Sequence, residues 1–356
     1  MEFRILDLFC GAGGFSCGLD SINEFKTVIG VDFNKQALET FDFNLHPDMT
    51  IYGDITQQDI KSNIINAAKK YNVNMIIGGP PCQGFSQKGK KLGLNDPRNF
   101  LFKEYLNIVR EIKPEVFIIE NVKNIISTEN GYFLQQIIEE TQKMGYNINY
   151  SILNAANFGV PEKRERAIFI ASLSKNILPP QGLNIPKVTI KDAINDLAYL
   201  NSGEGSIISE YINPPQSSYQ EMLRNPDGKL YNHIATKHKD IALKKLALIP
   251  PEGDKSALPS ELLGNQKFDI TWSRLKWDMQ SPTIDTRFDT PADGQTSHPF
   301  LNRAITPREA ARIQSFPDKY FFLGKKKEIT KQIGNAVPPL LAKAIGEQIL
   351  KSYINE

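Results

Sequence analysis

Cys82 follows Pro80 and Pro81 at the end of the apolar run 73–79, a position in which a fold could present a nucleophile. An apolar run that ends in Gly-Gly-Pro-Pro predicts a buried strand that enters a sharply turned loop. Each proline fixes its own φ angle and removes a backbone donor, so the chain at Cys82 has little freedom to relax. A thiol held there could attack a substrate at the carboxyl edge of a sheet, where open α/β folds bind ligands. The alternative is a cysteine that packs in the core after a structural turn.

A glycine-rich turn near the amino terminus could hold a nucleoside. Residues 10–16 follow the first predicted strand, and their glycines would let the backbone approach a ligand closely. The next predicted strand, 27–31, ends in Asp32, roughly 20 residues past the turn, where nucleotide-binding α/β folds hold a ribose hydroxyl. Because Ser16 stands at the third glycine position of the dinucleotide pattern, a nucleoside without a pyrophosphate, such as S-adenosylmethionine, fits better. Phe33 could stack on its adenine or belong to the core.

Polar side chains also accompany two later predicted strands. Glu120 ends the apolar run 116–119 and could hydrogen-bond a ring nitrogen and an exocyclic amine together. Its alternative is a solvated or helix-capping residue. Arg164 and Arg166 stand at alternate positions as the chain enters the strand 167–170, so we expect them to point to the same side. They could donate to a base carbonyl and a phosphate, or they could form a surface salt-bridge edge.

Together these segments resemble the motifs of the DNA (cytosine-5) methyltransferase family, in the family's order. The similar segments are 7–14 and 53–55 for the cofactor, 79–86 for catalysis, 120–122 for the carboxylate, 164–166 for the arginines, and 303–312 and 332–338 near the end. One position departs from the family: Glu162 stands where Gln is usual before the arginines, which leaves the packing of that side chain open.

The resemblance implies an α/β fold, a Rossmann-like S-adenosylmethionine-dependent methyltransferase with a mostly parallel, doubly wound sheet and a smaller, irregular target-recognition domain. Strand and helix patterns alternate up to about residue 186, after which loops rich in Pro, Ser, Asn and Gly take over. Helical patterns return at 307–315 and 340–350. We therefore expect a discontinuous catalytic and cofactor-binding domain, 1–186 and 328–356, interrupted by a target-recognition domain, 187–327.

The resemblance also implies the chemistry. C5 of cytosine is a poor nucleophile, and addition of the Cys82 thiolate at C6 makes it enamine-like. Glu120 would hydrogen-bond N3 and the exocyclic amine, and Arg166 would donate to the O2 carbonyl. Arg164, grouped with them as catalytic, would support the loop or a phosphate. No residue identifies itself as the base that removes the C5 proton, so we expect a water.

Two sets of binding residues follow from the resemblance. Those expected to bind S-adenosylmethionine are Phe9, Gly11, Ala12, Gly13, Gly14, Asp32, Phe33, Asp54, Ile55, Pro80, Leu101 and Asn335. Those expected to contact DNA are Gln83, Ser86, Lys88, Lys90 and Thr283. The loop 84–93 is rich in glycine and lysine and lacks helical or strand periodicity, so we expect it to close over phosphates once DNA is bound. A solvated surface loop is its alternative. The cytosine must be flipped out of the duplex before it can react.

Composition sets limits on partners. The 356 residues are 40% hydrophobic and carry a net charge of +2, so a DNA-binding face must be local. The three cysteines fit a reducing compartment, and the four scattered histidines offer no metal site. With no signal peptide or membrane-length apolar stretch, we expect a cytoplasmic bacterial enzyme that works on double-stranded DNA. We expect a monomer without metal or membrane partner, and a cognate restriction endonuclease encoded nearby is the partner that the resemblance suggests.

Three other functions remain in view. A transfer-RNA cytosine-5 methyltransferase shares the chemistry, although its relatives usually carry a different tripeptide after the cysteine, and the long insertion argues for DNA. A catalytically silent DNA-binding homologue would have lost Cys82, Glu120 or an arginine, and all are present. A nicotinamide-dependent oxidoreductase is disfavoured by Ser16.

Overall fold

The apolar runs of the first half of the chain form one seven-stranded sheet. The computed structural model describes residues 2–81, 101–264 and 269–354. Its main sheet has the strand order β3-β2-β1-β4-β5-β8-β6. The strands are β1 (Phe3–Leu8), β2 (Phe25–Asp32), β3 (Met49–Tyr52), β4 (Met75–Gly78), β5 (Val116–Val122), β6 (Asn147–Asn154) and β8 (Glu165–Ser172). All neighbours are parallel except β8, which runs antiparallel to both β5 and β6.

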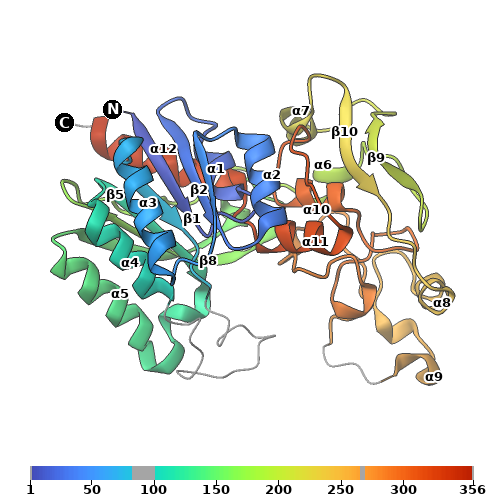
Figure 1. Ribbon diagram of the computed structural model, residues 1–356. Helices are drawn as coiled ribbons and strands as arrows, with labels where there is room; N and C mark the ends of the chain where they lie inside the picture. The colour runs from blue at the N-terminus through green and yellow to red at the C-terminus, as the bar shows by residue number, and fades with distance from the viewer. Residues whose placement is uncertain (1, 82–100, 265–268, 355–356) are drawn as a thin grey trace. The chain divides into compact units, whose positions relative to one another are not determined.

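Helices cover both faces of this sheet. In Figure 1, α3, α4 and α5 lie in front of the strands and α12 lies behind them. The helices of this part are α1 (Gly14–Leu19), α2 (Lys35–Leu45), α3 (Gln58–Lys70), α4 (Leu101–Ile112), α5 (Tyr132–Lys143) and α12 (Pro339–Ile354). Because both faces are covered, the central strands are buried almost throughout, as the apolar runs predicted. The α/β class and the mostly parallel, doubly wound sheet are confirmed.

The chain divides into two compact units. Unit 1 comprises Met1–Asn154, Glu165–Leu183 and Pro339–Glu356, and unit 2 comprises Ala155–Arg164 and Asn184–Pro338. The chain therefore returns to unit 1 at Pro339, whereas the sequence led us to expect a return at residue 328. Helix α11 (Lys326–Asn335) belongs to unit 2, as does the short segment Ala155–Arg164 that precedes β8.

Unit 2 is built from short elements joined by loops. Its helices are α6 (Ile190–Ile194), α7 (Ser218–Leu223), α8 (Asp240–Leu248), α9 (Ser260–Leu263), α10 (Pro307–Ile313) and α11. Its strands form two pairs, β9 (Gly205–Glu210) with β10 (Lys229–Ile234), and β7 (Glu162–Lys163) with β11 (Ser281–Pro282). Short 3₁₀ helices span Ala155–Phe158, Lys255–Ala257 and Pro291–Asp293 here, and Lys123–Ile126 and Thr128–Gly131 in unit 1.

Buried arginines hold these loops together. Arg164, Arg274, Arg303, Arg308 and Arg312 are all essentially inaccessible to solvent. Arg274 donates to four main-chain carbonyls, among them those of Leu246 at 2.8 Å and His298 at 3.0 Å. Irregular backbone has no ladder partners for its carbonyls, and a guanidinium offers five donors to supply them. Unit 2 therefore depends on polar side chains where unit 1 depends on sheet pairing.

Candidate active site

The carboxyl ends of four neighbouring strands form one edge of the sheet in unit 1. Leu8 of β1 pairs with Val31 of β2 on one side and with Gly78 of β4 on the other. Gly78 in turn pairs with Ile119 of β5. The segments that follow these residues emerge at one edge, and they are the glycine-rich turn, Asp32, the Pro80-Pro81 turn and Glu120. Open α/β sheets bind ligands at this edge, so we take it as the candidate active site.

The glycine-rich turn borders open space. Gly11 (φ +53°) and Gly13 (φ +85°) lie in the left-handed region that favours glycine. The Gly11 N–H donates to Asp32 Oδ2 at 2.8 Å, so the carboxylate that ends β2 fixes the turn that leaves β1. A Cβ placed on Gly11 would meet no atom within 4 Å. A ligand could therefore approach the main chain at this turn.

Asp32 and Phe33 differ in their exposure. Asp32 is buried, and its Oδ1 accepts the Asn34 N–H at 2.7 Å. Burial raises the pKa of Asp32, while the N–H groups of Asn34 and Gly11 oppose that rise. The side chain of Phe33 is 66% exposed, so it is not a core residue. Its exposed ring is available for stacking.

The remaining residues expected at the cofactor divide by burial. Ala12 and Ile55 are buried, and Gly14 begins α1. Asp54 is exposed and accepts the Thr56 N–H at 2.9 Å. Two further residues are partly buried: Phe9 packs against the main core from a left-handed backbone conformation, and Leu101 begins α4.

A second group of side chains lies at the end of β5. Arg166 Nε of β8 lies 2.9 Å from Glu120 Oε1, and both side chains are mostly buried. The antiparallel pairing of β5 with β8 brings them together, because Val122 is the direct partner of Arg166. A Cβ on Gly79 would lie 2.8 Å from Glu120 Oε2, so the carboxylate occupies the space that a side chain there would need. A carboxylate and a guanidinium thus stand side by side against the turn that follows β4.

Asn121 fastens that turn to the sheet. Its Nδ2 donates to the Pro80 carbonyl at 2.8 Å, and its Oδ1 accepts the Val122 N–H. Proline gives this segment no N–H of its own, so the side chain of a neighbouring strand supplies the contact. The sequence did not single out Asn121, although its place directly after Glu120 was a usable signal.

A buried acid lies beneath the glycine-rich turn and was also missed. Asp7 of β1 is inaccessible, and its Oδ2 accepts the Ser16 hydroxyl of α1 at 2.6 Å. Burial raises the pKa of Asp7 to about 8, the hydrogen bond from Ser16 opposes that rise, and the nearby charges of Asp32 and Asp20 add to it. The turn is therefore held from two sides, by Asp32 through Gly11 and by Asp7 through Ser16.

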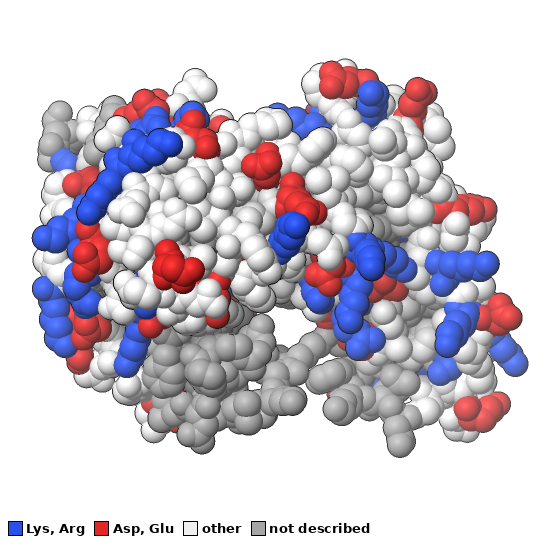
Figure 2. Space-filling view, viewed as in Figure 1, with Lys and Arg blue, Asp and Glu red and all other residues white. Residues whose placement is uncertain are grey.

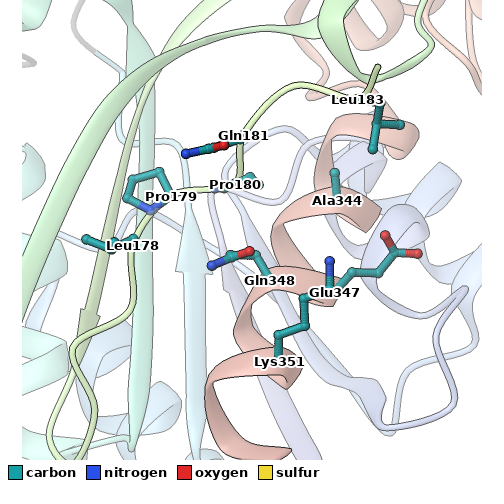
Figure 3. Close-up of a pocket in the computed structure, with 9 residues that line it drawn as sticks. All are labelled: Leu178, Pro179, Pro180, Gln181, Leu183, Ala344, Glu347, Gln348 and Lys351. Carbon is teal, nitrogen blue, oxygen red and sulfur yellow. The ribbon is translucent and has the colours of Figure 1, made fainter. Parts of the chain in front are cut away.

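Unit 1 also has a cavity away from this edge of the sheet. A cavity of about 320 Å³ lies between residues 178–183 and α12, and Figure 3 shows Gln181, Gln348 and Lys351 around it. Near the end of α12, the Tyr353 hydroxyl donates to Glu115 at 2.7 Å, and Glu115 directly precedes β5. This end of α12 is thus at the amino end of β5, and we do not assign the cavity to the reaction.

Comparison with known proteins decides the family. The C-5 cytosine-specific DNA methylase model matches residues 3–351. The chain belongs to this family. The Type II methyltransferase M1.HphI of Haemophilus parahaemolyticus is 34% identical over 100% of this chain and 89% of its own length. The Type II methyltransferase M.DdeI of Desulfomicrobium norvegicum is 35% identical over 97% and 88%.

Solved structures agree with the fold. A DNA modification methyltransferase encoded within a prophage of E. coli has a TM-score of 0.80 at 25% identity, with both chains covered completely. The Dnmt2 methyltransferase of S. pombe has a TM-score of 0.60 at 20% identity, again over both whole chains. The expected family is confirmed, and as a member of the C-5 cytosine-specific DNA methylase family the chain is a DNA (cytosine-5)-methyltransferase.

Three residues that the sequence assigned to the methylase site lie in unit 2. Arg164 is buried and donates to the carbonyls of Ile284 at 3.2 Å and Gly334 at 2.9 Å. Arg164 lies between β7 and β8, whereas Arg166 lies within β8 and pairs with Glu120, so the expectation that the two arginines point to the same side stays a prediction. Its contacts are those of a residue that positions loops. Thr283 and Asn335, the last residue of α11, are both exposed.

Several expected residues fall outside the described part of the chain. These are the nucleophile Cys82, the loop 84–93, and the DNA contacts Gln83, Ser86, Lys88 and Lys90. Within residues 2–81, 101–264 and 269–354, no cluster of His, Cys, Asp and Glu could hold a metal ion. In those ranges we also find no helix with the length and hydropathy that crossing a bilayer requires.

Proposed function

We propose that this methylase transfers a methyl group from S-adenosylmethionine to C5 of a flipped-out cytosine in a specific duplex DNA sequence, through a covalent adduct of Cys82 with C6. The observation that carries the proposal is the Glu120–Arg166 pair, 2.9 Å apart, against the turn that leads to Cys82. N3 of cytosine and its carbonyl oxygen O2 are both bonded to C2, so they lie close together. A carboxylate and a guanidinium that already stand side by side match their spacing.

The residues at the end of β1 and β2 fit the cofactor. Gly11 leaves open space at the turn, Asp32 presents a carboxylate at the strand end, and Phe33 presents an exposed ring. We assign them to the backbone approach, the ribose hydroxyls and the adenine of S-adenosylmethionine. When bound there, S-adenosylmethionine supplies an electrophilic methyl group. Asp54 lies two residues after the end of β3 and Leu101 begins α4, and we place both at the rim of the same pocket.

Cys82 and the polar residues of β5 and β8 have separate tasks in this mechanism. The Cys82 thiolate adds to C6, which makes C5 nucleophilic. Glu120 stabilises a proton at N3 as the thiolate adds, and it accepts a hydrogen bond from the exocyclic amine. Arg166 donates to O2, where negative charge develops. C5 then takes the methyl group, with S-adenosylhomocysteine as the other product, and loss of the C5 proton to water with elimination of Cys82 restores the ring. Asn121, by holding the Pro80 carbonyl, keeps the nucleophile's turn in place.

We assign recognition of the DNA sequence to unit 2. It lacks the strand–helix alternation of unit 1 and presents loops on a scaffold of buried arginines. Loops on a rigid scaffold commonly carry binding residues, and contacts with base edges specify sequence. We further propose that the enzyme acts as a monomer in the bacterial cytoplasm. Both relatives named above are Type II methyltransferases, which supports a restriction-modification role beside a cognate endonuclease.

Methyl transfer from labelled S-adenosylmethionine tests this proposal. The wild-type enzyme should label duplex DNA and leave transfer RNA unlabelled. Cys82→Ala should abolish labelling but still bind DNA, because covalent catalysis needs the thiol and docking does not. Cys17→Ala, which removes a partly exposed cysteine of α1, is the matched control and should remain active. Turnover of Cys82→Ala above roughly a thousandth of wild type would refute the covalent role, since each step depends on it. Preferential labelling of transfer RNA would refute the substrate.

A further inference from the structure

Two buried charges in unit 2 clamp a short piece of chain. Glu162 Oε1 accepts the Ile284 N–H at 2.6 Å and lies 3.5 Å from Arg164 Nη1. Arg164 in turn donates to the Ile284 and Gly334 carbonyls. Both side chains are inaccessible to solvent, so their charges are stabilised by each other and by main-chain groups. Glu162 thus accepts a main-chain N–H, which the side-chain oxygen of a Gln would also do, and it adds a charge beside Arg164.

The clamp holds the segment after β11 from two directions. Strand β7 pairs with β11 in parallel, with Glu162 opposite Ser281 and Lys163 opposite Pro282. On the other side, a Cβ on Gly334 of α11 would lie 2.5 Å from the Asp285 carbonyl carbon. Only glycine permits this close approach. The main chain that directly follows β11, up to Asp285, is therefore held by β7 on one side and by α11 on the other.

Lys163 is the exposed residue between the two buried charges. Lys163 is exposed to solvent, whereas Glu162 and Arg164 on either side of it are buried. Its carbonyl accepts the hydroxyl of Thr283, the residue directly after β11, at 2.9 Å, which fixes its backbone from a second segment. Within the described ranges of the chain no carboxylate pairs with its ammonium group. Thr283 uses its only donor in this contact, so here it positions Lys163.

We propose that Lys163 binds a backbone phosphate of the DNA substrate, on a platform made by Glu162, Arg164 and Thr283. This inference rests on the proposed function, because it names a contact to the same duplex. An ammonium group is a point charge that suits a phosphate and carries no sequence information. Arg166 of the catalytic pair is only three residues further along the chain. On the face seen in Figure 2, basic and acidic side chains are interspersed, so on that face a phosphate contact comes from individual placed cations.

Salt dependence of DNA binding tests the proposal. Fluorescence anisotropy with a labelled duplex that contains a mapped methylation site gives the slope of log K against log salt. Lys163→Gln should reduce that slope by about one. One lost contact should weaken binding about fivefold at 0.15 M salt, from the counterion-release term of a single phosphate. Lys163→Arg keeps the charge and should retain the wild-type slope. The matched control is Lys69→Gln, which removes an exposed lysine from the end of α3.

A second variant tests the platform. Thr283→Val removes the tether on the Lys163 carbonyl and should weaken DNA binding, whereas Thr283→Ser should not. Combined with Lys163→Gln, Thr283→Val should add little, because the tether acts through Lys163. Cofactor affinity, measured by calorimetry, should be unchanged in all of them.

Two results would overturn the inference. The first is an unchanged slope of log K against log salt in Lys163→Gln. The second is an additive loss of DNA affinity in the double variant, which would show that Thr283 contacts DNA itself. Failure of the wild type to methylate DNA would instead refute the proposed function, so the two failures are distinguishable.

Discussion

Asp7→Asn should make unit 1 more stable in mild alkali. In the unfolded chain Asp7 is ionised above its ordinary pKa of 3.8, whereas burial raises its pKa in the folded protein to about 8. Folding therefore takes up a proton between these two values. The stability that this proton confers is complete below the unfolded pKa and is lost as the pH rises through the folded one, at about 1.4 kcal/mol per pH unit. Asparagine cannot ionise, yet it keeps an oxygen that accepts the Ser16 hydroxyl.

The window from pH 6.5 to 8 separates Asp7 from most other groups. Burial raises the pKa of Asp20 to about 6, so its effect on the pH dependence of stability falls mostly below that window. His298, whose pKa burial lowers to about 3, destabilises only below its ordinary value of 6.5. The wild type should lose between about 1.5 and 2 kcal/mol of unfolding free energy across the window, as an order-of-magnitude value. Asp7→Asn should lose much less, and Asp42→Asn, which removes an exposed acid of α2, should behave as wild type.

Urea unfolding provides the measurement. Far-UV circular dichroism follows both units, while fluorescence follows unit 2 alone, because Trp272 and Trp277 are both there. The slope with pH should appear in the first signal and be absent from the second. Equal pH dependence of wild type and Asp7→Asn would refute the reasoning, since it would mean that Asp7 is ionised in the folded protein. Unfolding of both units in one transition would leave the comparison of the two variants valid.

Two further predictions concern charged pairs. Glu120→Gln keeps the shape of the side chain and removes its charge, so single-turnover rates should fall by about 10²–10³ with unchanged cofactor affinity by calorimetry; weaker cofactor binding at normal turnover would place Glu120 in the cofactor pocket instead. Arg303→Met leaves the buried Glu309 without its bidentate partner at 2.7 and 2.8 Å and should destabilise unit 2 by about 3–5 kcal/mol in fluorescence-monitored urea unfolding. Adding Glu309→Leu should recover much of the lost unfolding free energy, because the unpaired buried charge is then gone. If nothing is recovered, the loss comes from other contacts of Arg303.

The sequence predicted the parts of this methylase in which strands are continuous. The apolar run 73–79 became β4 and its turn, and the run 116–119 became the body of β5, because a strand buried on both faces needs apolar side chains throughout. The helical patterns at 307–315 and 340–350 became α10 and α12. In each case the local spacing of apolar residues is enough to identify the element.

Prediction failed where the period is interrupted. Arg164 is the single residue between β7 and β8, and its bonds to the Ile284 and Gly334 carbonyls join segments far apart in the sequence, so no local period could predict them. The return of the chain to unit 1 was placed at 328 instead of 339 because α11 and α12 are both helices with apolar faces, and nothing local tells which unit a face will meet. The pairs Asp7–Ser16 and Asn121–Pro80 join elements that only the fold brings together.

The two units satisfy buried main-chain groups in different ways, and this difference suits a division of labour. In unit 1 the sheet pairs its own carbonyls, so the strand ends that carry Asp32 and Glu120 are fixed by many repeated bonds. In unit 2 single arginines do this work, as Arg308 does for the carbonyls of Tyr231 and Tyr320. A guanidinium binds carbonyls whatever side chains the loops carry, because a main-chain carbonyl is common to all residues. Under the proposed function, loops between such anchors can therefore change their outward side chains, and with them the bases that unit 2 would read, while the residues at the sheet edge stay in place.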